Sequence, residues 1–198
     1  MEILRPYILA FIPVFVAVDA VANIPIFLSL VEHHSRKQKH KIVIDAVKTS
    51  TAVAIIFMCI GKWVFSLLGV TIPDFQIAGG MLLFVLSARL LFPGAQKDTL
   101  LHNHDRDMGV FPLGTPLITG PAVLTTILMM MNTFGIAATL VSLILNMGIV
   151  WLTLVKADLI MKAIGPSGTR AFSKIMYILL AAIAVMMVRH GIIGAFLT

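Results

Sequence analysis

Long apolar stretches, separated by short polar or charged segments, make up most of this 198-residue chain. A helix that crosses the hydrocarbon core of a bilayer needs roughly 20 mainly apolar residues. Windows of that kind cover residues 6–31, 42–69, 74–93, 110–133, 135–156 and 171–197. The pattern therefore predicts an all-α membrane protein with six transmembrane helices, in a single transmembrane domain over residues 1–198.

The composition agrees with this prediction. Hydrophobic residues make up 59% of the chain and charged residues 12%, which leaves too little polar surface to cover a water-soluble core. The first apolar stretch is too long for the core of a signal peptide and lacks a small-residue cleavage pattern, so we expect it to remain as the first helix.

The formal net charge is +6, and its distribution predicts the orientation in the membrane. Six spans place the connections 32–41, 94–109 and 157–170 on one face, and most basic residues lie nearer to that face. These residues are Arg36, Lys37, Lys39, Lys41, Lys48, Arg89, Lys97, Arg106, Lys156, Lys162, Arg170 and Lys174, whereas Arg5, Lys62 and Arg189 lie nearer to the other. The positive-inside rule then predicts a multi-pass cell-membrane protein with these loops in the cytoplasm and both termini outside. We expect no nucleic-acid partner, because the basic residues are distributed according to membrane topology. Membrane lipid is an expected partner.

A weak internal repeat appears when the chain is shifted along itself by 96 residues. Pro25 then falls on Pro121, and Gly69 falls on Gly165. Two halves of three spans, residues 1–97 and 98–198, would enter the membrane in opposite directions and form inverted repeats. The alternative is a chance coincidence of two proline-kinked helices, since membrane helices tolerate proline.

Proline within the first and fourth spans predicts that helices 1 and 4 are discontinuous. In "VANIPIF", residues 21–27, Asn23 is placed to act near the N-cap of a helix that starts at Pro25. In "FPLGTPLITGPAVL", residues 111–124, Thr119 and Gly120 precede Pro121 in the same way. Unpaired backbone groups in lipid need protein, water or a ligand to satisfy them.

A small zwitterion fits two such breaks. The N-termini of the new helices suit a carboxylate, and the upstream carbonyl groups suit an ammonium group or a cation. Asp19 is an ionisable group within a span and is a functional candidate by default, with a structural cap as the alternative. Small residues leave room for only a small side chain: Ala20, Ala22, Gly114, Gly120 and Ala122.

Other spans add weaker candidates. Gly79 and Gly80 are adjacent in the third span, where paired small residues permit close helix packing and backbone contact with a substrate is the alternative. Thr49, Ser50 and Asn146 are candidates to line the cavity. Neither His33, His34 and His40 nor His102 and His104 follow a recognisable zinc spacing, so we expect no metal and no cofactor beyond a coupling proton or Na⁺.

These residues resemble the MarC family of six-span membrane proteins, which includes the SnatA small neutral amino acid transporters. The family pattern D-P-x-G-N-x-P-x-F is matched by "DAVANIPIF", with Ala20 and Ala22 in place of proline and glycine; "IAGGMLLF" and "FPLGTPLITGP" are similar too. The resemblance implies an inverted three-plus-three fold and transport of glycine, alanine or similar amino acids. Its central group is Asp19, Asn23, Pro25, Gly79, Gly80, Pro116, Thr119, Gly120 and Pro121, to which Ala22 and Ala122 are added as small neighbours.

The expected function is therefore a secondary transporter of small neutral amino acids, and not an enzyme. Two alternatives remain: a channel or pore formed by the same interrupted helices, and an intramembrane enzyme that uses Asp19 and Asp45. The sequence does not determine the direction of flux, the coupling ion or the oligomeric state.

Overall fold

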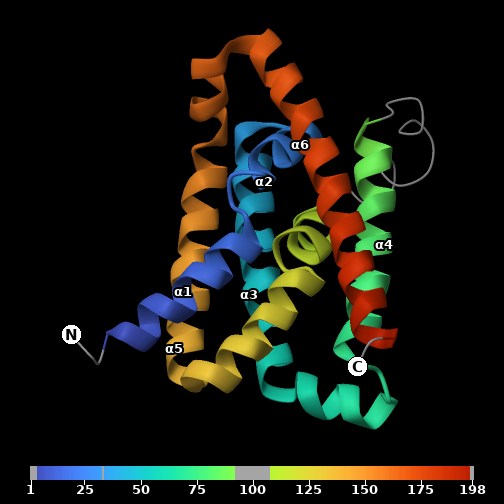
Figure 1. The fold of residues 1–198 in the computed structure, drawn as a ribbon. Helices are drawn as coiled ribbons and strands as arrows, with labels where there is room; N and C mark the ends of the chain where they lie inside the picture. The colour runs from blue at the N-terminus through green and yellow to red at the C-terminus, as the bar shows by residue number, and fades with distance from the viewer. Residues whose placement is uncertain (1–3, 33, 92–107, 197–198) are drawn as a thin grey trace.

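The computed structural model describes residues 4–32, 34–91 and 108–196, and these ranges are helical without a strand. The all-α prediction is confirmed for this part of the chain (Figure 1). The elements are α1 (Arg5–Val18), α2 (Asn23–Leu30), α3 (Arg36–Leu68), α4 (Ile72–Leu91), η2 (Gly109–Ile118), α5 (Pro121–Val155) and α6 (Ala157–Phe196).

Several of these elements are long and apolar enough to cross a membrane. Three qualify alone, Arg36–Leu68, Pro121–Val155 and Lys174–Phe196, and α1 with α2 qualifies as a pair bent by 42°. η2 is a shorter apolar helix. Many large side chains on the outside of the bundle are apolar and exposed, among them Val16 at 69% and Met129 at 65%. An apolar outer surface of this kind fits a protein surrounded by lipid.

Glycines with positive φ mark the corners of the chain. Gly69 ends α3 at φ 66°, Gly135 lies within α5 at φ 84°, and Gly165 lies within α6 at φ 79°. L-residues rarely adopt such values, whereas glycine does so at no steric cost. Gly135 divides α5 at the point where two of the predicted spans meet, so the chain reverses there without a polar loop, as Figure 1 shows.

α4 and α6 make the most extensive helix contact in the fold. A Cβ on Gly80 would lie 2.7 Å from the carbonyl oxygen of Ala184, and a Cβ on Gly191 would lie 2.7 Å from that of Pro73. Residue numbers rise along one helix as they fall along the other, so α4 and α6 are antiparallel. Glycine allows this approach because it has no side chain to hold the backbones apart.

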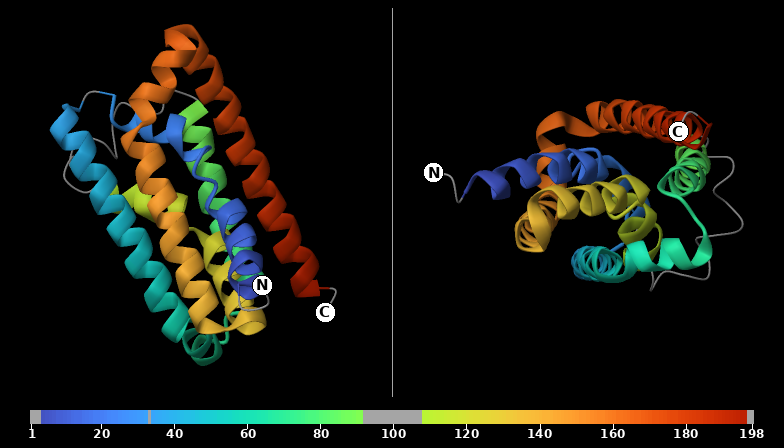
Figure 2. Two further views of the ribbon diagram at one scale, coloured as in Figure 1. Left: turned by 90° about the vertical axis from the view of Figure 1, so that its left-hand side faces the viewer. Right: turned by 60° about the horizontal axis from the view of Figure 1, so that its bottom comes forward.

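In two further pairs of elements, residue numbers rise in the same direction along both partners; Figure 2 shows one of them, α1 next to α5. α1 lies along the second part of α5, where Ser142 Oγ donates to the carbonyl of Tyr7 at 3.4 Å. η2 lies along α3, where a Cβ on Gly109 would meet the carbonyl of Ile42 at 2.6 Å. The core sits between these pairs and includes Val14, Leu113, Ile118, Ile127 and Leu143, each 0% exposed.

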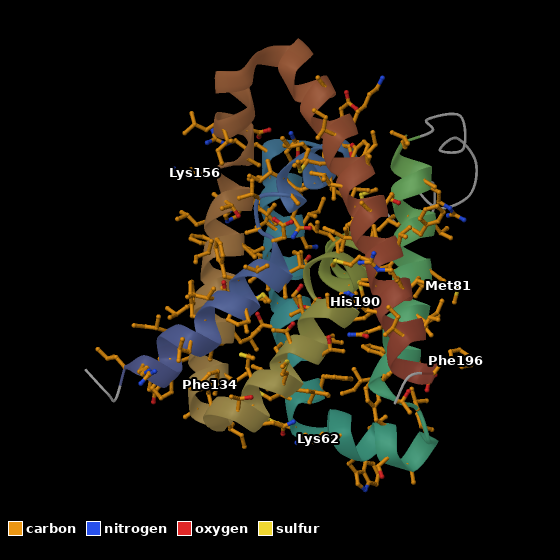
Figure 3. All side chains as sticks on the ribbon, in the orientation of Figure 1. Lys62, Met81, Phe134, Lys156, His190 and Phe196 are labelled. Carbon is orange, nitrogen blue, oxygen red and sulfur yellow. The ribbon has the colours of Figure 1, made fainter. Side chains whose placement is uncertain are left out.

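The connections α2–α3 and α5–α6 lie at one end of the bundle. Their residues line one cavity, and Lys39 of α3 pairs with Asp158 of α6 at 3.3 Å. Figure 3 places Lys156 at this end and Lys62 and Phe134 near the opposite one. Two of the three loops predicted on one face therefore share an end. Most of the third, 94–109, lies outside the described residues.

Candidate functional site

The first helix is interrupted where the sequence pattern predicted it. α1 ends at Val18 and α2 begins at Asn23, with Asp19 in the left-handed region at φ 43°. The prediction that the new helix starts at Pro25 with Asn23 as its N-cap is wrong: Ala22 is the N-cap, and no side chain caps it. The first turn of α2 can include Pro25 because a proline there removes an N–H that has no partner within the helix.

Asn23 satisfies the end of α1 instead of the start of α2. Its side-chain amide donates to the carbonyl of Val18 at 3.0 Å and to that of Asp19 at 3.2 Å, and the residue is 4% exposed. The last carbonyls of a helix have no backbone partner, so a buried amide placed there removes a desolvation cost. Two of the upstream carbonyls expected to face a ligand are therefore occupied by the chain itself.

Asp19 is exposed at the edge of this break. Its Oδ1 accepts a hydrogen bond from the N–H of Ala22 at 3.3 Å. The carboxylate thus closes the turn that leads into α2. This is the structural capping role that was the alternative to a functional one. An exposed carboxylate has acceptor positions left over, so this contact does not prevent it from binding a cation as well.

The second break is longer and more irregular. Within η2, Phe111 and Thr115 have extended backbone angles, and each precedes a proline in a cis peptide. Gly120, extended at ψ −179°, is the N-cap of α5, and Pro121 occupies the first turn. The discontinuity predicted for the fourth span is therefore present, and the helix after it starts at Pro121 as the sequence indicated.

A closed set of hydrogen bonds ties this break to α3. Ser50 Oγ donates to the carbonyl of Gly114 at 2.9 Å, and Thr119 Oγ1 donates to the carbonyl of Ser50 at 3.1 Å. The backbone N–H of Thr119 also donates to Gly114 at 3.0 Å. Ser50 is 0% exposed and Thr119 1%. Both hydroxyl donors are thus used within the protein, and binding of a substrate through either residue stays a prediction.

The start of α5 keeps unpaired donors. In the described part of the chain, the backbone N–H groups of Gly120, Ala122 and Val123 make no hydrogen bond, and Gly120 and Val123 are buried. The corresponding groups of α2 are largely used, because the N–H of Asn23 donates to Asp19 and that of Ile24 to Val21. The anion-binding character predicted for both breaks is therefore concentrated at the second. Val123 was not among the residues predicted from sequence.

Gly79 brings α4 against this helix start. A Cβ on Gly79 would overlap Cγ of Pro121 and lie 2.6 Å from its Cβ, so the two elements touch only because residue 79 is glycine. Close packing against a broken helix, which the paired glycines predicted, is confirmed. No gap as wide as a methyl group separates α4 from the start of α5 here.

The remaining candidate residues lie either at the second break or against α1. α2 contacts η2 and α5, and it contacts α6 more extensively. A Cβ on Gly114 would lie 3.2 Å from Cβ of Thr49, so Thr49 belongs with the second break. Asn146 instead faces α1: its amide donates to Ser142 at 2.9 Å and to Phe11 at 3.4 Å. Its side-chain oxygen is buried without a partner among the described residues. Pro116 is half-buried within η2.

A separate cavity of about 1080 Å³ opens at the end where α2 leads into α3 and α5 into α6. No residue of either break lines it; Phe27 of α2 does. In the described ranges, no three His, Cys, Asp or Glu side chains lie close enough together to hold a metal ion. His33, His102 and His104 lie outside those ranges.

Comparison with known proteins gives one family. Residues 4–196 match the model of the MarC family integral membrane proteins. The chain is 34% identical to UPF0056 membrane protein MJ0972 of Methanocaldococcus jannaschii, over 99% of this chain and 90% of the relative. It is 30% identical to a UPF0056 membrane protein of Archaeoglobus fulgidus, over 92% of this chain and 90% of the relative. It is 24% identical to UPF0056 inner membrane protein YhgN of Escherichia coli, over 88% of this chain and 89% of the relative. These names describe membrane proteins and mention no enzymatic activity. No solved structure matches.

Proposed function

Because the chain belongs to the MarC family of integral membrane proteins, we propose that it is a secondary transporter of small neutral amino acids such as glycine and alanine. In this proposal the substrate binds between the break that follows α1 and the start of α5. The observation that carries the proposal is the set of unpaired N–H groups at Gly120, Ala122 and Val123. A buried helix start with bare donors and a partial positive charge suits a carboxylate.

The two poles of an amino acid divide between the breaks. The carboxylate is held by the N–H groups of α5, and the ammonium group by Asp19, whose exposed carboxylate accepts one hydrogen bond from the chain. Asn23 and Thr119 fix the backbone on either side by binding carbonyl groups. Gly79 limits the space beside Pro121, which favours substrates with a small side chain.

The packing of the fold supports an inverted three-plus-three repeat. α4 and α6, the third helices of the two halves, are antiparallel, whereas η2 on α3 and α1 on α5 are both parallel pairs. A pseudo-two-fold axis in the membrane plane exchanges the two parallel pairs and maps the antiparallel pair onto itself. Alternating access then comes from rocking one half against the other. The loops 32–41 and 157–170 face the cytoplasm in this arrangement, according to the distribution of basic residues.

Access to the site requires α4 and the start of α5 to separate. The backbone around the second break is buried in the described conformation, and Gly79 lies directly against Pro121. This conformation is therefore closed at the second break. A substrate shifts the equilibrium only if it binds one conformation more tightly than the other.

The test is uptake of labelled glycine and alanine by proteoliposomes that contain the purified full chain. Saturable uptake with counterflow, increased by an imposed proton or Na⁺ gradient, supports the transporter. Linear, non-saturating flux without exchange supports a pore and contradicts the proposal.

Asp19→Asn tests the assignment of the ammonium pole. We expect gradient-driven accumulation to be lost while the protein stays folded, because asparagine can still accept the hydrogen bond from Ala22. Asp74→Asn is the matched control: Asp74 is exposed at the start of α4, and its carboxylate accepts hydrogen bonds from Thr71. Accumulation that is unimpaired by Asp19→Asn removes Asp19 from the site.

A further inference from the structure

The cavity at the loop end of the bundle has two chemically different parts, one basic and one apolar. The basic residues are Arg36, Lys37 and Lys39 at the start of α3 and Lys156 and Lys162 around the start of α6. The apolar part, which we call the floor, is formed by Phe27, Val43, Leu154, Val155 and Leu159.

The positive charge in this cavity is largely uncompensated. Asp158 is the acidic residue among those that line the cavity, and it pairs with Lys39 at 3.3 Å. Within the described ranges, Arg36, Lys37, Lys156 and Lys162 have no carboxylate partner. Four like charges around one opening repel each other, and a bound anion relieves that repulsion.

We propose that this cavity binds the phosphate headgroup of an anionic phospholipid. Basic residues between membrane helices at the cytoplasmic face are suited to such headgroups. The apolar floor distinguishes a lipid from a free phosphate, because it provides a surface for the glycerol backbone and the first part of an acyl chain. The volume of about 1080 Å³ is larger than a phosphate ion needs.

The bound lipid joins parts of the chain that are distant in sequence. One wall of the cavity belongs to α3 and the other to the turn from α5 into α6, and the ion pair Lys39–Asp158 spans them at one point. A headgroup that contacts both walls stabilises the same arrangement. The inference does not depend on what the protein transports.

The two tryptophans of the chain allow a direct test. Trp151 lies on α5 one helical turn before Val155 of the cavity floor and is 42% exposed; Trp63 follows Lys62 near the opposite end and is 66% exposed. Trp63→Phe leaves a reporter near the cavity, and Trp151→Phe leaves one remote from it. Each variant is reconstituted in phosphatidylcholine vesicles that contain either brominated phosphatidylglycerol or brominated phosphatidylcholine at the same mole fraction.

We expect brominated phosphatidylglycerol to quench Trp151 more strongly than brominated phosphatidylcholine, with no such preference at Trp63. Each basic residue near the headgroup contributes roughly a fivefold preference. Lys37→Gln with Lys156→Gln should therefore lower the relative affinity for phosphatidylglycerol by roughly 25-fold. Arg5→Gln with Arg189→Gln, which removes the same charge elsewhere, should leave it unchanged.

Lys37→Arg with Lys156→Arg keeps the charge and should keep the preference, which separates loss of charge from loss of folding. Absence of a preference in the parent protein, or an equal preference after the glutamine changes, overturns the proposal. Saturable binding of labelled inorganic phosphate that the glutamine changes abolish, in a parent protein without a preference for brominated phosphatidylglycerol, assigns the cavity to soluble phosphate and overturns the lipid assignment.

Discussion

Gly79→Ala should destabilise the protein, because no space for a methyl group exists between α4 and the start of α5. The new Cβ would lie 2.6 Å from Cβ of Pro121 and closer still to its Cγ. Carbon atoms in contact are normally about 3.5–4.0 Å apart, so the two elements must move apart by about 1 Å or more. The proline ring is stiff and cannot turn away as a flexible side chain could. Overpacking of this kind costs about 1–3 kcal/mol.

The matched control is Gly148→Ala, on the same kind of helix. In the described part of the chain, no side chain and no other helix lies within 4 Å of a Cβ added at Gly148, and the residue is exposed. Alanine is there favoured over glycine by about 0.5–1 kcal/mol through helix propensity. The midpoints of thermal unfolding in detergent, followed by tryptophan fluorescence, should thus differ by at least about 3 °C between the two variants. Equal midpoints, or a higher midpoint for Gly79→Ala, would refute the reasoning that residue 79 is glycine for lack of space.

Three further predictions concern side chains rather than the backbone. Asn23→Leu should lower stability by about 1–3 kcal/mol in the same thermal assay, because the buried carbonyl of Val18 loses the side-chain amide and the carbonyl of Asp19 keeps only the N–H of residue 23, and an unchanged midpoint would contradict this role. Ser50→Ala and Thr119→Val should each destabilise, but their combined loss should be smaller than the sum, since both belong to one hydrogen-bonded set; additive losses in a double-mutant cycle would show that they act separately. Lys39→Gln and Asp158→Asn should each change stability by less than about 1 kcal/mol, because the pair is partly exposed, and a loss of several kcal/mol would assign it a larger structural role.

Much of the fold can be predicted from local patterns in the sequence. Apolar stretches of bilayer length predict helices, and proline or glycine within them predicts where the helices end, because those residues limit the backbone whatever surrounds them. The interruption of the first span, the start of α5 at Pro121 and the turn between residues 133 and 135 were predictable in this way, although α2 begins two residues before Pro25.

The roles of polar residues at the breaks were harder to predict. Asn23 is two residues before a proline, and that spacing favours an N-cap; only the folded backbone brings its amide to the carbonyls of Val18 and Asp19. A side chain at a break can satisfy either the helix that ends or the helix that begins, and both choices look alike in the sequence. The unpaired N–H of Val123 has no signature at all, since it depends on which donors the surrounding protein leaves free.

The sequence by itself determined a helical membrane protein with two interrupted segments, because hydrophobicity and backbone restriction are properties of the residues themselves. Tertiary structure alone decided which segments touch. It brings Gly79 against Pro121 and Ser50 against the second break, and it gathers basic side chains from the start of α3 and from the turn between α5 and α6 around one cavity. Such contacts arise from the packing of distant helices, where the free energy depends on shape and on which polar groups remain unpaired after the chain has folded.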